Sequence, residues 1–110
     1  MQLPNGEHAF VDLTKLRDHV LNPRHPRGRH KARVFASVLQ ILQSDAQLLR
    51  NELLQAALRQ EALQAENDAY GQRYIVDFEC TKGERAAMVR SGWIILTNED
   101  FPRLTTCFVL

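Results

Sequence analysis

The sequence has few of the features that mark disulfide-rich, secreted or membrane-spanning proteins. Its 110 residues include two cysteines, Cys80 and Cys107, which lie far apart and show no CxxC spacing. A disulfide scaffold usually contains more cysteines, so we expect both to be reduced strand residues in a cytoplasmic protein. No segment approaches the ~18 apolar residues of a membrane span, and residues 1–12 lack the apolar run of a signal peptide. We therefore expect no membrane as a partner.

An excess of charge of either sign is also missing. The 14 Lys and Arg residues are nearly balanced by 13 Asp and Glu residues, which leaves a net charge of +1. The chain as a whole is therefore not a basic nucleic-acid-binding protein, and any such binding must come from a local patch. Hydrophobic residues make up 45% of the sequence, enough for a core, and the length suits a single domain over residues 1–110.

Hydrophobic periodicity divides the chain into a helical first part and a strand-forming second part. Helical spacing predicts helices over about 13–21, 28–42 and 45–63, after a short edge strand over 9–11. Alternation from Tyr70 onward predicts one strand up to a hairpin turn at 81–84, then strands over 86–96 and 104–110. We expect an α+β domain with about three N-terminal helices packed on one face of a three- to four-stranded antiparallel sheet.

The segment 21–35, LNPRHPRGRHKARVF, is the densest in unusual residues. Two prolines and a glycine shape the backbone before the predicted helix, and no acid interrupts the basic residues. Five cations fall within ten positions, together with His25 and His30: Arg24, Arg27, Arg29, Lys31 and Arg33. Crowded cations repel, so an anion such as phosphate, held by these side chains and by the helix start, would explain them. The alternative is a solvated helix face.

His25 is the candidate general base of this segment. Neighbouring cations favour a neutral imidazole, which is the form that accepts a proton. Alternatively, His25 makes a local hydrogen bond that orders the loop, while His30 lies on the helix, where exposure is the ordinary expectation. The sequence has no GxSxG elbow, Walker loop, HExxH pair or dinucleotide fingerprint, and no adjacent Cys joins the histidines in a zinc pattern. We expect no metal and no cofactor.

The strands contribute a further set of candidate residues. If Val89 and Trp93 face the helices, with Trp93 near Phe35, then Arg90 and Arg73 lie on the open face of the sheet, as do Asp77 and Glu79. Such a face is either a substrate platform or a solvated surface with cross-strand ion pairs. One of the neighbouring residues Thr105 and Thr106 must also face the open side, where its hydroxyl would reach a phosphate.

The segments LNPRHPRGRHKARVF, YGQRYIVDF, VRSGWI and EDFPRLTTCFVL resemble a family of small bacterial proteins that carries only a domain-of-unknown-function label. That family is distantly similar, in architecture and residue type, to the Barnase–EndoU–colicin–RelE group of metal-independent ribonucleases. The resemblance implies an active site on the open sheet face, and many members of the group are toxins. It implies that His25 is the base, that Lys31 and Arg90 clamp phosphate, and that Thr106 is the strand hydroxyl. The sequence departs from the group in lacking an obvious Glu–His pair.

These observations lead to one leading hypothesis and two alternatives. The leading hypothesis is a metal-independent endoribonuclease that is the toxin of a bacterial toxin–antitoxin pair, with RNA as substrate and a small antitoxin or immunity protein as partner. The expected substrate-binding residues are Arg24, Arg27, Arg29, His30, Arg33 and Arg73. The first alternative is a non-catalytic module that binds RNA or another phosphate-bearing anion. The second is an antitoxin- or immunity-type protein that binds its partner through a sheet edge.

Overall fold

A computed structural model describes the whole chain, residues 1–110. The helical elements are η1 (Gly6–His8), α1 (Leu13–Lys15), η2 (Leu16–Val20), α2 (Arg29–Val34), η3 (Phe35–Leu39), η4 (Gln43–Asp45) and α3 (Ala46–Arg59). The strands are β1 (Leu63–Asn67), β2 (Gly71–Lys82), β3 (Arg85–Leu96) and β4 (Arg103–Val109). The segments α1 and η2 form one continuous helical stretch, and so do α2 and η3.

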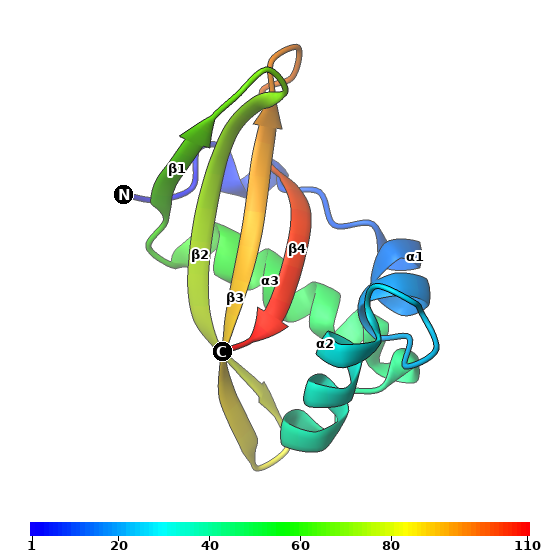
Figure 1. Cartoon of the computed structure of the whole chain (residues 1–110). Coiled ribbons are helices and arrows are strands. Elements are labelled where there is room, and N and C mark those ends of the chain that lie inside the picture. Colours follow the sequence, from blue (N-terminus) through cyan, green and yellow to red (C-terminus); the bar gives the residue numbers. More distant parts are fainter.

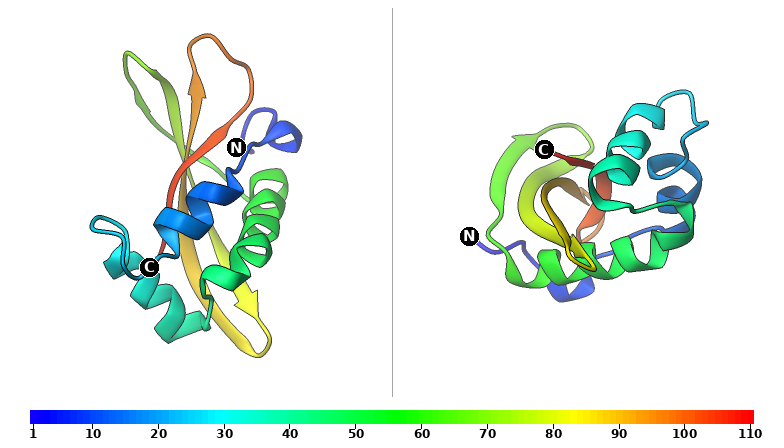
Figure 2. Two further views of the ribbon diagram at one scale, coloured as in Figure 1. Left: turned by 90° about the vertical axis from the view of Figure 1, so that its right-hand side faces the viewer. Right: turned by 90° about the horizontal axis from the view of Figure 1, so that it is seen from below.

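The four strands form one antiparallel sheet in the order β1-β2-β3-β4. Helix α3 crosses behind this sheet, whereas α1 and α2 stand beside the edge formed by β4 (Figure 1). In the side view of Figure 2, α2 also reaches the side of the sheet opposite to α3. The predicted α+β class, with the helices preceding an antiparallel sheet, is confirmed.

Two predicted helix boundaries and one predicted strand are wrong. The third helix ends at Arg59, not near residue 63, and residues 63–67 form β1 instead. This strand is exposed on both faces, so its sequence carries no alternation that could have shown it. The second helix ends at Leu39 because Gln40 adopts a left-handed backbone, with φ of 53°. The predicted edge strand over 9–11 is only an isolated bridge between Phe10 and Arg103.

The core lies between the sheet and the helices and contains 21 buried residues in one cluster. Trp93 from β3 and Phe35 from η3 both belong to it, and both are 0% exposed. This confirms that the face carrying Val89 and Trp93 packs against the helices. Cys80 and Cys107 are also buried in this core as free thiols, and burial raises the pKa of each to about 12. None of the helices combines the length and the apolar content needed to cross a membrane.

One polar side chain, that of Ser91, is fully buried in the core. Its hydroxyl donates to the Val76 carbonyl at 2.7 Å and accepts from the Trp93 indole N–H at 2.9 Å. Trp93 is therefore held both by packing and by a hydrogen bond that its indole needs when buried. Through the alternation of the strand, this anchor also determines which residues of β3 face away from the helices.

We expect Ser91→Ala to lower the free energy of unfolding by about 1–3 kcal/mol, because it leaves the buried Trp93 N–H without an acceptor. Urea denaturation followed by tryptophan fluorescence measures this change. Ser37→Ala is the matched control, since Ser37 is exposed on η3 and should leave the urea midpoint near that of the wild type. Equal midpoints for both variants would contradict the assigned role of Ser91.

Candidate functional site

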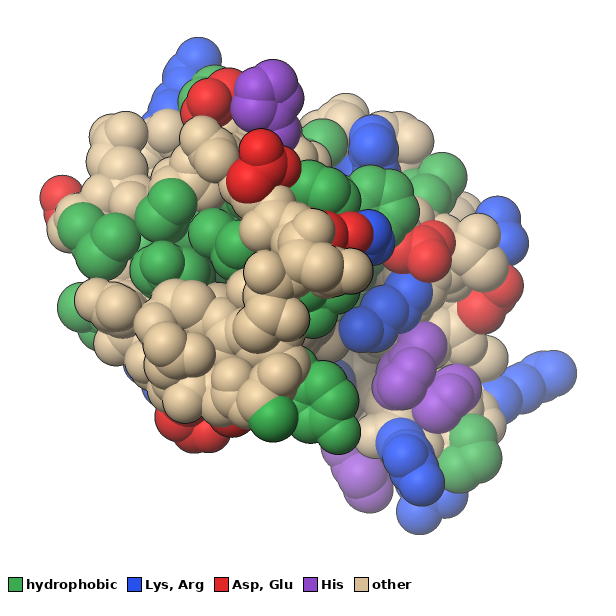
Figure 3. Space-filling model, turned by 90° about the horizontal axis from the view of Figure 1, so that it is seen from above, with side chains coloured by type: hydrophobic (Ala, Val, Ile, Leu, Met, Phe, Trp, Pro, Cys, Tyr) green, Lys and Arg blue, Asp and Glu red, His purple; other side chains and the backbone are tan.

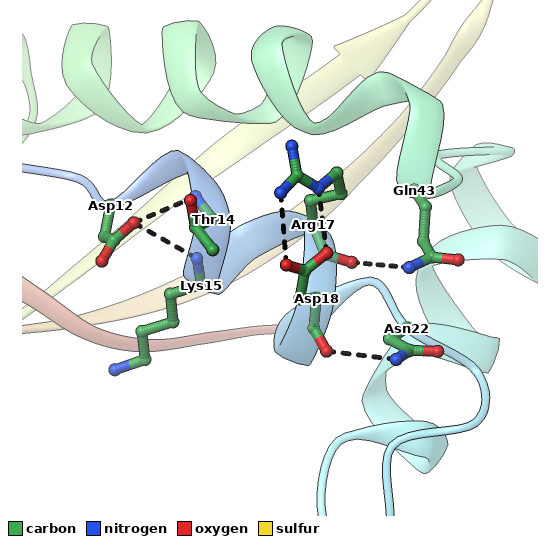
Figure 4. A network of polar contacts seen from close by, with 7 residues as sticks. All are labelled: Asp12, Thr14, Lys15, Arg17, Asp18, Asn22 and Gln43. Atoms are coloured by element: carbon green, nitrogen blue, oxygen red, sulfur yellow. Dashed lines mark hydrogen bonds and ion pairs between the residues drawn. The ribbon is translucent and has the colours of Figure 1, made fainter.

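The start of α1 directs a lysine toward the sheet. The Asp12 carboxylate accepts hydrogen bonds from the Thr14 and Lys15 backbone N–H groups at 2.9 and 3.3 Å, which caps the helix (Figure 4). From this capped turn the Lys15 side chain extends to β4, where its ammonium donates to the Thr105 carbonyl at 2.8 Å. An ammonium has three donors, so Lys15 keeps hydrogen-bonding capacity for an anion.

Asn22 organises the beginning of the basic loop. Its amide nitrogen donates to the Asp18 carbonyl at 3.1 Å (Figure 4), and its amide oxygen accepts from the Arg24 N–H at 3.0 Å. The first bond ties the loop to the helical stretch that precedes it, and the second forms the side-chain turn typical of Asn. In the same network, the Gln43 amide donates to the Arg17 carbonyl at 2.8 Å. The loop therefore has a fixed start.

Two histidines are stacked at the centre of this region. The rings of His25, from the loop, and His19, from η2, have centroids 3.8 Å apart and planes inclined by 15°. The Nδ1 atom of His25 accepts from the Arg27 and Gly28 backbone N–H groups, at 3.1 Å each. When His25 is neutral, its proton is therefore on Nε2, so this ring presents a donor and not a free lone pair.

Gly28 is required where it is because its backbone lies against His19. A Cβ atom at this position would collide with the His19 carbonyl oxygen and would lie 2.9 Å from the Cδ2 atom of the His19 ring. The glycine thus lets the loop close over η2 and bring His25 onto His19. Gly28 is therefore needed for the close packing of the loop against His19.

Lys31 and Thr106 are brought together across 75 positions of sequence. The Lys31 ammonium donates to the Thr106 hydroxyl at 3.2 Å and lies 5.0 Å from the centre of the Phe108 ring. Lys31 is on α2 and the other two residues are on β4, so this contact joins the helical part of the chain to the sheet. A cation at this distance from an aromatic face is attracted to it, which restrains the flexible lysine.

A β-bulge shapes the strand side of the site. Gly92 on β3 pairs with Thr106, but the next residue, Trp93, pairs with Leu104, so Thr105 is the extra residue. A Cβ atom on Gly92 would lie 2.9 Å from the Thr105 hydroxyl and 3.3 Å from the Thr106 methyl group. The bulge therefore brings both threonine side chains beside Gly92, whereas strict alternation predicts only one of them on that side.

The positive charge of this region is not neutralised within the protein. The cations of segment 21–35 form no ion pair, whereas five of the other basic side chains in the chain do: Arg17, Arg73, Lys82, Arg90 and Arg103. Figure 3 shows Lys, Arg and His side chains gathered at one end of the molecule, with two His side chains touching. Burial, followed by repulsion from His25, Lys15, Lys31 and Arg27, lowers the pKa of His19.

Two of the predicted site residues on the sheet are already paired. Arg90 donates two hydrogen bonds to Asp77, both at 2.9 Å, and its guanidinium holds the pKa of that carboxyl below its usual range. Arg73 donates one hydrogen bond to Asp68, at 2.8 Å, and forms an ion pair with it. The Arg90–Asp77 pair is the kind of cross-strand ion pair expected if this face is a solvated surface. Arg90 still lies next to the site, since it pairs in register with Phe108.

The remaining predicted residues surround the site without contacting its centre. Five of these side chains are exposed: Arg24, Arg27, Arg29, His30 and Arg33. The structure thus joins Lys31 to Thr106 and places His25 on His19. The predicted substrate-binding arginines of segment 21–35 are exposed, whereas Arg73 is paired with Asp68. Nowhere in the chain do three or more His, Cys, Asp or Glu side chains come together in an arrangement that could hold a metal ion.

Sequence reasoning missed two residues of this region, Lys15 and His19. They are four positions apart in the first helical stretch, so they share one helical face. This four-residue spacing is the only sequence feature that links the two residues. It does not indicate a site by itself, because a single cation and a single histidine on a helix are ordinary surface residues.

A family model matches residues 2–110, which is nearly the whole chain. The chain belongs to DUF6883, a domain of unknown function. This confirms membership of an uncharacterised domain family. No curated protein and no solved structure matches the chain.

We expect the lowered pKa of His19 to make stability depend on pH. The unfolded chain, in which His19 has its ordinary pKa of about 6.5, binds a proton more readily than the folded one, so stability falls as pH falls through about 6.5 toward the lower pKa. Urea midpoints at pH 7.5 and 5.5 measure this loss. His19→Gln should reduce the loss, and His8→Gln, which alters an exposed histidine on η1, should keep it. Identical losses in wild type and His19→Gln would contradict the prediction.

Proposed function

We propose that this domain is a metal-independent endoribonuclease and that the junction of α2 with β4 is its active site. The observation that carries the proposal is the Lys31–Thr106 contact, 3.2 Å long, beside a stacked histidine pair in a region without acidic partners. An ammonium and a hydroxyl together bind a phosphate oxygen, and unpaired cations draw a polyanion to them. A role as a cytoplasmic toxin of a bacterial toxin–antitoxin pair belongs to the same proposal.

The residues present suit cleavage by the RNA's own 2′-hydroxyl. In that reaction a base removes the 2′-hydroxyl proton, the 2′-oxygen bonds to phosphorus, and the 5′-oxygen leaves with a proton. Lys31 and Lys15 would stabilise the extra negative charge of the crowded phosphorus intermediate, and Thr106 would orient a phosphate oxygen. A neutral imidazole serves as the base at physiological pH. The products would be a 2′,3′-cyclic phosphate and a free 5′-hydroxyl.

A non-catalytic module that binds RNA or another phosphate-bearing anion is the second candidate. Two observations favour it: Asp77 already occupies the Arg90 guanidinium, and backbone N–H groups occupy Nδ1 of His25. In this case the exposed cations of segment 21–35 would bind phosphates and no bond would break. The two candidates share the binding surface and differ only in turnover.

The toxin role would require a small antitoxin or immunity protein, and the exposed apolar surface supports one. Large apolar side chains are left exposed on α2 (Val34), on η3 (Val38) and just before η4 (Leu42), and Leu63 is exposed on the edge strand β1. Val34 and Val38 share their helical stretch with the unpaired cations Lys31 and Arg33, and that combination suits an acidic protein with apolar anchors.

Affinity for single-stranded RNA should fall with salt, because each phosphate contact releases counterions. The log–log slope is about −0.7 per contact for single strands. Arg29→Ala/Lys31→Ala should flatten the slope by roughly two contacts, about 1.4 in log–log terms. Fluorescence anisotropy from low to moderate NaCl concentration measures it. Arg59→Ala/Arg85→Ala removes the same charge elsewhere and should leave the slope unchanged. A slope that is equally steep in both double variants would reject phosphate capture by this segment.

Purified protein should cleave a mixed RNA pool and should do so equally with and without EDTA. The fragments should carry 2′,3′-cyclic phosphate ends, which mass spectrometry detects. Lys31→Ala should lower both binding and cleavage, since its cation acts on the bound substrate and on the transition state alike. RNA left intact by well-folded wild-type protein that still binds it would reject the nuclease and support the binding module.

A further inference from the structure

We propose that His19 is the group that accepts the 2′-hydroxyl proton, and that His25 is a positioning residue that holds the His19 ring in place. This inference rests on the proposed ribonuclease function and names a residue that sequence reasoning did not select. It is carried by the different hydrogen-bonding states of the two stacked rings and by the charges around them.

His19 has what His25 lacks, a ring whose nitrogens are both unused. Neither nitrogen of His19 takes part in a hydrogen bond within the protein, and the side chain is half-buried. In contrast, Nδ1 of His25 accepts from two backbone N–H groups, so its neutral form presents only Nε2–H. A general base needs an unshared lone pair within reach of the substrate proton, and only His19 of the stacked pair offers one when both rings are neutral.

Two contacts restrain the His19 ring, and the hydrogen bonds of His25 reinforce one of them. His25 covers one of its faces at a centroid distance of 3.8 Å. Gly28 lies against its Cδ2 edge so closely that no side chain would fit. The two hydrogen bonds from the Arg27 and Gly28 N–H groups orient the His25 ring. Because His25 is stacked on His19, the loop also restrains the His19 ring. This is why His25 would act through His19 and not on the substrate itself.

Burial lowers the pKa of His19, and the groups that lower it further by charge repulsion come from α1, the loop and α2. They are Lys15 from α1, Arg27 and His25 from the loop, and Lys31 from α2. In the free protein this surrounding favours the neutral ring, which is the form ready to accept a proton. A bound phosphate offsets the same cations, so the imidazolium formed during the reaction is less disfavoured once substrate is present.

The step conserves atoms and protons. The 2′-hydroxyl gives its proton to His19, O2′ forms a bond to phosphorus, and the bond from phosphorus to O5′ breaks. The proton then passes from the His19 imidazolium through water to the departing 5′-oxygen. The protein returns to its starting state, and no oxidant, reductant or additional reactant is consumed.

The test compares His19→Gln, His25→Asn and the control His8→Gln. We expect His19→Gln to lower cleavage by roughly 10²–10⁴-fold, the range for a positioned base. Its binding to a 2′-O-methyl oligonucleotide, which cannot be cleaved, should stay within about 2-fold, because a neutral imidazole contributes no phosphate charge. His8→Gln should cleave like the wild type.

The pH profile separates a base from a structural residue. In wild type and His25→Asn, kcat/KM should fall on the acid side as the base becomes protonated, with the midpoint displaced in His25→Asn. In His19→Gln this acid limb should disappear. NMR titration of the wild-type histidines supplies a measurement that does not depend on the variants folding. The acid limb should coincide with the His19 titration, and neutral His25 should show the Nε2–H form.

The outcomes distinguish this inference from the proposed function. Wild-type protein that binds RNA without cleaving it overturns both. Cleavage that persists undiminished in folded His19→Gln, or an acid limb that follows another histidine, overturns the assignment of the base while the ribonuclease stands. A neutral His25 with its proton on Nδ1 would overturn the positioning role.

Discussion

The burial of Trp93 decides what the open face of the sheet contains. Successive strand residues point to opposite faces, so fixing Trp93 against the helices sends Arg90 and Gly92 to the other side. The Ser91 hydroxyl strengthens this choice by satisfying the indole N–H inside the core. Cross-strand register then places Thr106 and Phe108 next to Gly92 and Arg90. The strand side of the candidate site is therefore a consequence of how the core packs.

The helix side of the site follows a different constraint, because none of the cations of segment 21–35 is paired with a carboxylate. Elsewhere on the surface the domain matches arginine with a carboxylate, as in Arg90 with Asp77 and Arg103 with Glu99. Segment 21–35 has no such partner, and its cations repel one another. Asn22, the His25 ring and the close packing of Gly28 instead hold the loop through neutral contacts. A loop ordered in this way keeps its positive charge available to a ligand.

Sequence patterns predicted those parts of the structure that follow from local periodicity. The helical stretches, the β2–β3 hairpin and the buried face with Trp93 have strong periods, and Lys31 stood out by the charge density around it. The exposed strand β1 has no period to detect. The bulge at Thr105 and the stacking of His19 on His25 arise from contacts between distant segments, which local patterns do not encode. The charge of Arg90 was visible in the sequence, but its neutralisation by Asp77 depends on strand register.

The stacked histidines link these two halves of the site. Two imidazoles whose centres are 3.8 Å apart, with Lys15 and Lys31 nearby, cannot both carry a proton without strong repulsion. Burial and these neighbouring cations lower the pKa of His19, and a phosphate bound as proposed would offset the cations. The Lys31 ammonium bonds to the Thr106 hydroxyl on the sheet, and its charge also lowers the pKa of His19. If the site binds an anion as proposed, Lys31 would couple that binding to the proton affinity of His19.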